Sequence, residues 1–413
     1  MIVRALAQWK KSYTGIPRNI WLLSLISLIN RCGSLVIAFL TLYLTQERHL
    51  GIREAGYATA FFGLGSIVGS YTGGRLTDRF GSSPVQFVSL VLNGIVLVVL
   101  YYITDFYLIC SGIFIMALTG EAFRPANSVA IAANCTPETR TRSISLYRMS
   151  ANMGWAVAPA LGGLLVIFGW PWLFWVDGLT CVAAAVALYL LFPPTVARQK
   201  SEKQAEEIQQ NGGRSPWKDG DFLWFCFLTM LNATVFMQLI WMIPVFWKEA
   251  YGWSESLVGI MSAVNGLIVF LVEMPLVFRI EKLRTPLFFV RTGLFLYAVS
   301  YWSILVPFDP LMMVTLFTVV ISLGEVLVMP FSSNFVFGRS KGGFQGQYMS
   351  LYGIAYSVAN TIAPLYGTQA AAAYGYPVLW IMLGTQAILV LFGFWWLEKR
   401  ISHRVSTAVQ RED

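Results

Sequence analysis

The residues of this chain that could do chemistry are charged side chains inside long apolar stretches. Arg31, Glu121 and Glu325 each lie near the centre of such a stretch. A charge in the middle of a bilayer costs at least ~2.5–3.5 kcal/mol on insertion scales, so it needs a partner, a water-filled cavity or a function. A carboxylate in a partly dry cavity can bind and release a proton, and a nearby guanidinium changes that balance. The alternative for each residue is a static buried ion pair.

Other charges in the apolar stretches have simpler interpretations. Arg124 follows Glu121 by three residues, so on a helix it can neutralise that carboxylate. Asp177 lies two turns into its stretch, after the segment GWPWLFW, and we expect it to cap or pair locally near the outer interface. Three charges nearer the ends of their stretches are expected to reach the interface or to form pairs: Arg148, Glu273 and Arg291.

Uncharged polar residues accompany these charges. Asn30, Asn232, Gln238 and Trp241 could supply hydrogen bonds and a stacking face to a small molecule. The 29 Phe and 14 Met could form an adaptable apolar pocket, although lipid-facing and interfacial positions account for most aromatic residues of a membrane protein. The five cysteines include no close C-x-x-C pair, so we interpret them as small buried residues and expect no metal site.

The elements that must position these residues are membrane-spanning helices. The chain has 413 residues, of which 56% are hydrophobic and 12% charged, and its mean hydropathy is +0.62. A soluble domain carries about 25% charged residues, so this composition excludes a soluble globular enzyme and a disordered protein. Many apolar segments are about 20 residues long, which is enough to cross a bilayer as an α-helix.

Twelve spans are predicted, six on each side of a polar stretch, which makes the fold class an all-α polytopic membrane protein. The spans cover approximately residues 19–45, 54–76, 84–103, 106–134, 144–168, 171–193, 222–247, 254–279, 286–307, 310–337, 348–373 and 376–397. We therefore expect a six-helix bundle over residues 1–193, a cytoplasmic linker over 194–221, and a second six-helix bundle with a cytoplasmic tail over 222–413.

The basic residues predict the orientation. With both termini in the cytoplasm, 22 of the 29 Lys and Arg fall in the tails and cytoplasmic loops, four fall within spans, and three fall in outward loops. Such an excess of positive charge is typical of the cytoplasmic side. The net charge of +8 is thus explained by a membrane rather than by nucleic acid. We expect a multi-pass protein of the plasma (inner) membrane.

The two halves of the chain repeat one another. Five features recur at an offset of 202 to 206 residues: Asn30 at Asn232, Gly120–Glu121 at Gly324–Glu325, the SLY of 145–147 at 350–352, the Ala-Pro of 158–159 at 363–364, and Gly169–Pro171 at Gly375–Pro377. A nearly constant offset indicates duplication. Two parallel six-span repeats are an architecture of secondary transporters.

The loop between the second and third predicted spans reads GGRLTDRFGSSP. It resembles the signature G-x-L-a-D-R-x-G-R-R of the major facilitator superfamily, with Gly74, Leu76, Asp78, Arg79 and Gly81 at matching positions and serines in place of the final basic pair. In that family the Asp and the first Arg help to latch the two halves on the cytoplasmic side. Gly permits a close approach of helices, and charged groups at a helix end can form a breakable clasp.

The fifth predicted span reads GWAVAPALGG. It is similar to the G-x-x-x-G-P-x-x-G-G motif of the superfamily's antiporters, in which Gly154, Pro159, Gly162 and Gly163 match and Ala158 replaces the second Gly. Small residues permit tight helix packing, and generic packing is the alternative interpretation. The motif favours antiport.

Two further segments resemble the proton-coupled oligopeptide transporters of the same superfamily. LGEVLVMP at 323–330 contains their L-G-E, and EAFRPANS at 121–128 is similar to their F-K-P-N segment, with Arg124 in place of Lys. The first span, however, has Asn30–Arg31 where those transporters show E-x-x-E-R. The whole chain is closer to a drug–proton antiporter.

The resemblance implies a role for each candidate residue. In this superfamily spans 1, 4, 7 and 10 line a central cavity, which Arg31, Glu121 and Glu325 would then face from both halves. We expect Glu325 and Glu121 to bind coupling protons, and Arg31 and Arg124 to contact the substrate. Alternating access would export small amphipathic or drug-like molecules by proton antiport. The alternative is proton-coupled symport of peptides or other small polar nutrients.

Other function classes find little support in the sequence. It contains no G-x-x-x-x-G-K-[ST] for ATP binding and no G-x-S-x-G or H-E-x-x-H, and its two histidines are His49 and His403. A polytopic membrane enzyme is therefore a remote alternative. We expect no cofactor and no nucleic acid; the expected partners are protons, a small-molecule substrate and the lipid bilayer, and the chain is expected to act as a monomer.

Overall fold

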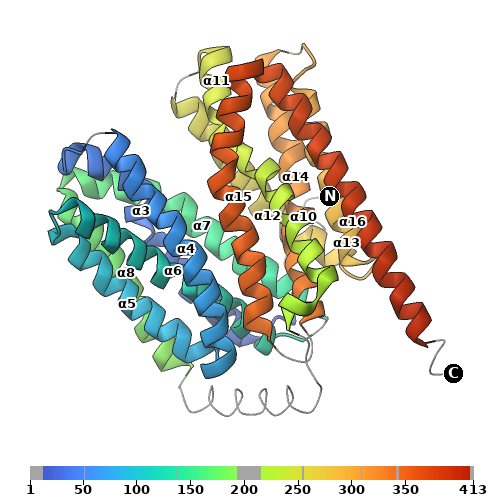
Figure 1. Ribbon diagram of the computed structural model, residues 1–413, viewed down its shortest axis with the longest axis horizontal. Helices are drawn as coiled ribbons and strands as arrows, with labels where there is room; N and C mark the ends of the chain where they lie inside the picture. Colours follow the sequence, from blue (N-terminus) through green and yellow to red (C-terminus); the bar gives the residue numbers. More distant parts are fainter. Residues whose placement is uncertain are drawn as a thin grey trace. The chain divides into compact units, whose positions relative to one another are not determined.

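The computed structural model describes residues 13–50, 52–136, 138–192, 215–253, 255–307, 309–340 and 344–409. Throughout these ranges the regular secondary structure is helical, and no strand occurs in them. The all-α prediction is confirmed, and every predicted span coincides with one long helix or with two or three consecutive helices (Figure 1).

The chain divides into two compact units. Among the described residues, the N-terminal unit comprises those between 15 and 215 and between 340 and 357, and the C-terminal unit comprises residues 13–14 and those between 216 and 339 and between 358 and 409. The predicted division at 193 and 222 differs from these units in two respects, since residues 13–14 group with the C-terminal helices and residues 340–357 group with the N-terminal helices. Most of the predicted linker, residues 194–214, lies outside the described residues, and its end contains a 3₁₀ turn at Pro216–Lys218.

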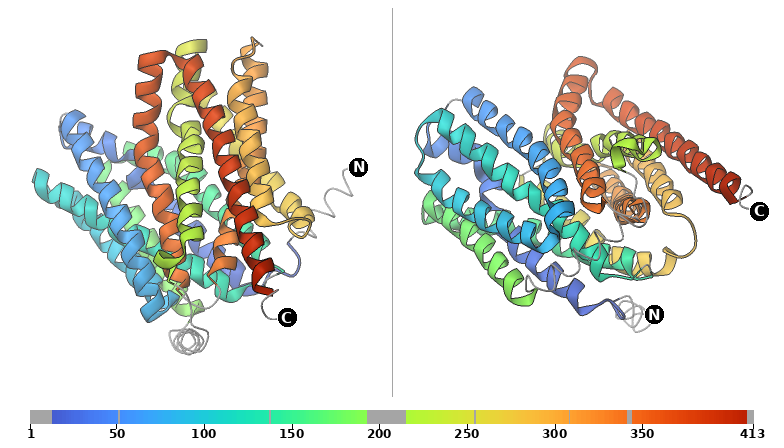
Figure 2. Two further views of the ribbon diagram at one scale, coloured as in Figure 1. Left: turned by 45° about the vertical axis from the view of Figure 1, so that its right-hand side comes forward. Right: turned by 60° about the horizontal axis from the view of Figure 1, so that its bottom comes forward.

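The helices of the N-terminal unit pack in pairs. In Figures 1 and 2, α5 and α8 run side by side and α4 packs on α6. The third pair is α2 with α7. The bounds are α2 (Arg18–Cys32), α3 (Leu35–Leu42), the π-helix η1 (Tyr43–Glu47), α4 (Ile52–Phe80), α5 (Ser82–Tyr102), α6 (Phe106–Asn134), α7 (Arg140–Ile167) and α8 (Trp170–Leu191).

The helices of the C-terminal unit repeat part of this packing. The pairs α12·α14, α13·α14 and α13·α16 correspond in chain order to α4·α6, α5·α6 and α5·α8. The bounds are α10 (Gly220–Trp241), α11 (Ile243–Tyr251), α12 (Glu255–Ile280), α13 (Pro286–Ser303), α14 (Pro310–Arg339), α15 (Gln345–Tyr374) and α16 (Tyr376–Val409). The start of α15 belongs to the N-terminal unit.

Local structure also repeats between the halves. Gly169 and Gly375 both have a positive φ, of 117° and 80°, and both precede a helix with Pro in its first turn. Asp105 accepts a hydrogen bond from the N–H of Leu108 at the start of α6, and Asp309 accepts one from Leu311 at the start of α14. The internal repeat therefore extends from the sequence to the helix caps.

The hydropathy of the helices agrees with a membrane protein. Within the described ranges, eight helical segments are long and apolar enough to cross a bilayer. The predicted spans over 54–76, 144–168, 286–307 and 348–373 lie on α4, α7, α13 and α15, which are not among those eight.

Two predicted spans are not continuous helices. The first, 19–45, is divided between α2 and α3 at Gly33–Ser34, and its end continues as the π-helix η1. The seventh, 222–247, is divided at Met242, where Pro244 follows and cannot donate a backbone hydrogen bond. The prediction of a single helix over residues 19–45 was wrong because it took apolar length as the guide and could not detect a tertiary capping partner.

Candidate functional site

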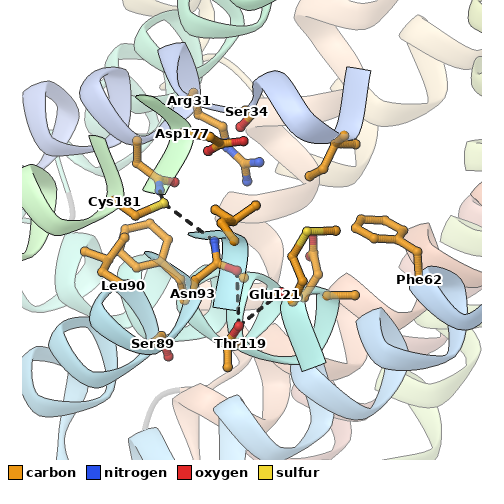
Figure 3. Close-up of a pocket in the computed structure, with 17 residues that line it drawn as sticks. Arg31, Ser34, Phe62, Ser89, Leu90, Asn93, Thr119, Glu121, Asp177 and Cys181 are labelled. Atoms are coloured by element: carbon orange, nitrogen blue, oxygen red, sulfur yellow. Dashed lines mark hydrogen bonds between the residues drawn. The ribbon is translucent and has the colours of Figure 1, made fainter. Parts of the chain in front are cut away.

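A pocket lies inside the N-terminal unit, where α2, α3, α5, α6 and α8 meet (Figure 3). Its empty volume is about 540 Å³, part of which is open to solvent. The polar lining residues are Asn30, Arg31, Ser34, Ser89, Asn93, Thr119, Glu121, Asp177 and Cys181. Three of the predicted site residues, Asn30, Arg31 and Glu121, thus share one pocket.

An ion-pair system lies at one side of this pocket. The Oε2 atom of Glu121 lies 3.2 Å from Nη1 of Arg124, one turn further along α6. Arg31, on α2, is attracted by Glu121 and repelled by Arg124. The structure thus contains the expected pair of Glu121 with Arg124, and Arg31 and Glu121 line the same pocket.

Asn93 joins the pocket walls by hydrogen bonds, as Figure 3 shows. Its Nδ2 donates to Sγ of Cys181 at 3.6 Å, and its Oδ1 accepts from the hydroxyl of Thr119 at 3.1 Å. Asn30 also donates to Sγ of Cys181, at 3.5 Å. The sequence reasoning missed Asn93, although an isolated amide within the apolar segment VLNGIV was a signal that could have found it.

Glycines of α7 allow the broken first helix to approach closely. A Cβ atom on Gly154 would lie 2.5 Å from Cβ of Arg31, and one on Gly162 would lie 2.6 Å from the ring of Phe39. The antiporter-like motif therefore packs against both α2 and α3. Gly163 has more room, because its nearest neighbour would lie at 3.9 Å. Pro159 lies on α7 between these glycines.

Asp78, in the loop motif that follows the second predicted span, caps the start of α15. Asp78 lies two residues beyond the predicted span, and its Oδ1 accepts a hydrogen bond from the N–H of Gly346 at 2.7 Å. Its Oδ2 accepts one from the N–H of Gln347 at 3.1 Å. Gly74 lies under the same turn, where a Cβ would come within 2.6 Å of the carbonyl oxygen of Gly346.

The other two residues of this motif occupy the end of α4. Arg79 lies in the last turn, and its guanidinium is 5.3 Å from the ring of Phe80. Gly81 has φ of 86° and precedes α5, a conformation that favours glycine. The role of Asp78 and Arg79 in latching the two halves stays a prediction.

The C-terminal unit holds the remaining candidates. Glu325 is buried on α14, and its Oε2 lies 3.5 Å from Nδ2 of Asn265, which also donates to the hydroxyl of Ser322 at 2.8 Å. A cavity shared by Glu325 with Arg31 and Glu121 stays a prediction.

The uncharged candidates of the C-terminal unit all lie on α10. Gln238 is buried and donates to the carbonyl oxygen of Ala363 at 2.8 Å, and Trp241 donates to Asn360 at 3.2 Å. Asn232 is buried on the same helix. Their binding of substrate stays a prediction.

Comparison with known proteins decides the family. A sequence model of the Major Facilitator Superfamily matches residues 21–336 and 225–412. The chain belongs to the Major Facilitator Superfamily. It is therefore a transporter and not an enzyme, and the resemblance inferred from the loop motif is confirmed.

Relatives within the superfamily span nearly the whole chain. The sequence is 24% identical to the Na⁺, Li⁺, K⁺/H⁺ antiporter of Planococcus maritimus, over 88% of this chain and 91% of that protein. It is 23% identical to the multidrug resistance protein MdtH of Aeromonas salmonicida, over 90% of this chain and 93% of that protein. Its fold is similar to that of the human organic anion transporter MFSD10, with a TM-score of 0.74 and 14% sequence identity. The match covers 91% of this chain and 99% of that protein.

Proposed function

We propose that this transporter exports small amphipathic or drug-like molecules in exchange for protons. The observation that carries the proposal is Glu121, a carboxylate in the middle of a predicted span that lines a pocket with Arg31 and pairs with Arg124 at 3.2 Å. Two relatives support it by name, one as a cation/proton antiporter and one as a multidrug resistance protein.

The proposed exchange uses the charge of Glu121. While Glu121 is ionised, it holds Arg124 and attracts Arg31. In this state a substrate binds through a group that donates hydrogen bonds to the carboxylate and through a polar part that contacts Arg31 and Arg124. A proton that binds Glu121 removes the attraction for the substrate and releases it. Loss of that proton on the other side of the membrane restores the ionised site, so proton and substrate are never bound together. Glu325, at the matching position of the repeat, is proposed as a second proton site.

The energy of a proton gradient is sufficient for this exchange. One charge moving across 100 mV supplies ~2.3 kcal/mol. We place the protein in the plasma membrane as a monomer, with both termini in the cytoplasm, because the basic residues are concentrated on one predicted side. We further propose that residues 1–193 and 222–413 form the two six-helix bundles of the transporter.

The test is proton movement in liposomes that contain the purified protein and an internal pH dye. A panel of lipophilic cations, peptides and organic anions is added, and wild type is compared with Glu121→Gln and Glu325→Gln. Glu249→Gln is the matched control, because Glu249 is an exposed carboxylate that accepts from the hydroxyl of Tyr376.

The expected result is proton flux opposite to substrate flux, lost in the Glu121→Gln and Glu325→Gln variants and kept in the control. Proton flux in the same direction as the substrate would instead establish symport of a polar nutrient. Unchanged coupling in both variants would refute the assignment of the two carboxylates.

A further inference from the structure

The break in the first helix leaves backbone donors inside the protein. α2 ends at Cys32 and α3 begins at Leu35, near the middle of the predicted span. The first N–H groups of a helix have no acceptor within the helix, so those of α3 need a partner. In a bilayer core, water does not supply one.

Asp177 of α8 is that partner. Its Oδ2 atom accepts hydrogen bonds from the N–H of Leu35 at 3.1 Å and from the N–H of Val36 at 3.0 Å. The residue is buried, with 4% of its surface exposed, and no described residue forms an ion pair with it. The expectation that Asp177 caps or pairs locally near the outer interface was wrong, because the helix that it caps is α3, more than 140 residues away in the chain, and α3 begins in the middle of a span.

Close packing holds the break in place on two further sides. A Cβ on Gly33 would overlap the hydroxyl oxygen of Thr180, and Thr180 donates that hydroxyl to the carbonyl oxygen of Asp177 at 2.8 Å. On the other side, Gly154 of α7 lies against Arg31. The N–H of Leu35 also donates to the carbonyl oxygen of Gly33 at 2.6 Å, whereas Asp177 is the ionisable group that accepts from both Leu35 and Val36 at the break.

The charged and titratable groups near Asp177 are few. Of the elements packed against α8, α2 contributes Arg31 to the pocket, α3 contains no titratable residue, α5 contributes the uncharged Ser89 and Asn93, and α7 contributes no lining residue. Glu121 of α6 and Cys181 of α8 complete the set. Figure 3 shows Asp177, Arg31 and Cys181 in this one pocket.

We propose that Asp177 is a further proton-binding residue of this transporter and that its negative charge maintains the break between α2 and α3. The proposal deepens the proposed proton antiport and rests on it. A hydronium ion from the solvent gives its proton to Oδ1 or Oδ2: one O–H bond of the hydronium breaks, one O–H bond of the neutral carboxyl group forms, and a water molecule leaves. The neutral group holds the two N–H donors less strongly, because hydrogen bonds to an ionised acceptor are the stronger kind and a helix N-terminus favours a negative charge.

This weaker cap has a consequence for Arg31. Arg31 lies in the last turn of α2, beside the break, and its carbonyl oxygen accepts from the N–H of Ser34 at 3.2 Å. When the cap weakens, the backbone around the break loosens and the position of the Arg31 guanidinium changes. Protonation of Asp177 is thereby transmitted to the residue proposed to contact the substrate.

The test is hydrogen exchange of the full chain in lipid nanodiscs, followed by mass spectrometry of peptides that cover residues 32–42. Exchange is measured between pD 5 and 8 and corrected for the intrinsic rate. In wild type we expect the amides of Leu35 and Val36 to exchange about tenfold faster at the acidic end. In Asp177→Asn, which keeps an acceptor but no charge, we expect fast exchange at both ends.

The matched control is Asp105→Asn, because Asp105 is another helix cap, accepting from Leu108 at 2.9 Å, and it lies outside the pocket. This variant should keep the wild-type profile over residues 32–42. A wild-type profile without any dependence on pD would overturn the proposal, and this measurement needs no variant to fold. So would an Asp177→Asn profile that changes with pD as wild type does.

The exchange measurement separates this proposal from the proposed function, since it requires neither substrate nor gradient. If residues 32–42 respond to pD through Asp177 while liposomes show no proton-coupled transport, the antiport proposal fails and the proton site remains. If transport is proton-coupled in Asp177→Asn to the wild-type extent, the antiport stands and Asp177 has no part in it.

Discussion

The carboxylate of Asp78 binds the first turn of α15, since its Oδ1 accepts the N–H of Gly346 at 2.7 Å. Asp78 and Gly346 are 268 residues apart in the chain, and both belong to the N-terminal unit. The loop motif between the second and third spans therefore has a defined structural partner, the start of the eleventh predicted span.

Burial raises the pKa of Asp78 from its ordinary value of 3.8 to about 6, although its bonds to Gly346 and Gln347 act in the opposite direction. Because the pKa of Asp78 is higher in the folded protein than in the unfolded chain, the protonated carboxyl group stabilises the fold. This stabilisation is fully present below pH 3.8 and is lost as the pH rises through about 6. The free-energy advantage of wild type over Asp78→Asn should fall by ~3 kcal/mol across this window. Thermal unfolding in detergent at several pH values measures it, and a difference independent of pH would contradict this.

Gly33→Ala should disrupt the helix break, because its Cβ would overlap the hydroxyl oxygen of Thr180. Overpacking of this kind costs ~1–3 kcal/mol. Thermal unfolding should show the loss, with partial recovery in Gly33→Ala combined with Thr180→Ala. Gly266→Ala is the control, since nothing lies within 4 Å of that position and the helix should gain stability. Equal effects at both glycines would refute the packing argument.

Asp221 should be important for the stability of the C-terminal unit. It is buried, and its carboxylate contacts three guanidinium groups, those of Arg339, Arg400 and Arg404, at 3.5, 3.0 and 2.7 Å. Asp221→Ala removes this acceptor from Arg400 and Arg404, whereas Arg339 keeps its hydrogen bonds to Asp219. Because the three arginine side chains are 28%, 41% and 55% exposed, solvent offsets part of the lost attraction, and we expect a loss of about 1.5–3 kcal/mol in unfolding free energy. Asp309→Ala, which removes an exposed cap, should cost ~1 kcal/mol. A loss at Asp221 no larger than at Asp309 would show that the arginines are stabilised by solvent instead.

Arg31 and Arg124 should differ in their importance for transport. The Arg124 side chain is 43% exposed, and partly exposed ion pairs contribute ~0–1 kcal/mol, so Arg124→Ala should fold normally. Arg31 lies beside the helix break and lines the pocket, so Arg31→Ala should abolish substrate flux. Flux in liposomes and thermal unfolding together distinguish the two. Loss of flux in Arg124→Ala with full flux in Arg31→Ala would reverse the assignment.

The sequence predicted that Asn30 and Arg31 of the first span and Glu121 of the fourth span lie at a similar depth, because hydropathy reveals how deep a residue lies along a span, and the three residues line one pocket inside the N-terminal unit. That they face a central cavity together with Glu325 stays a prediction. The sequence also predicted the pairing of Glu121 with Arg124, since residues three apart lie on the same helix face. It could not place Asp177 or Asn93, because their roles depend on contacts of α8 and α5 with other helices. The break at Gly33 was missed for the same reason, since its packing partner is 147 residues away on α8 and no proline marks it.

The most direct test of proton antiport is the sign of substrate flux under an imposed pH gradient in liposomes that contain wild-type protein and equal substrate on both sides. The account predicts that substrate moves against the proton flow, that its direction reverses when the pH gradient is reversed, and that Glu121→Gln abolishes both movements. Substrate that moves with the protons, or that stays at equal concentration under either gradient, would contradict the account.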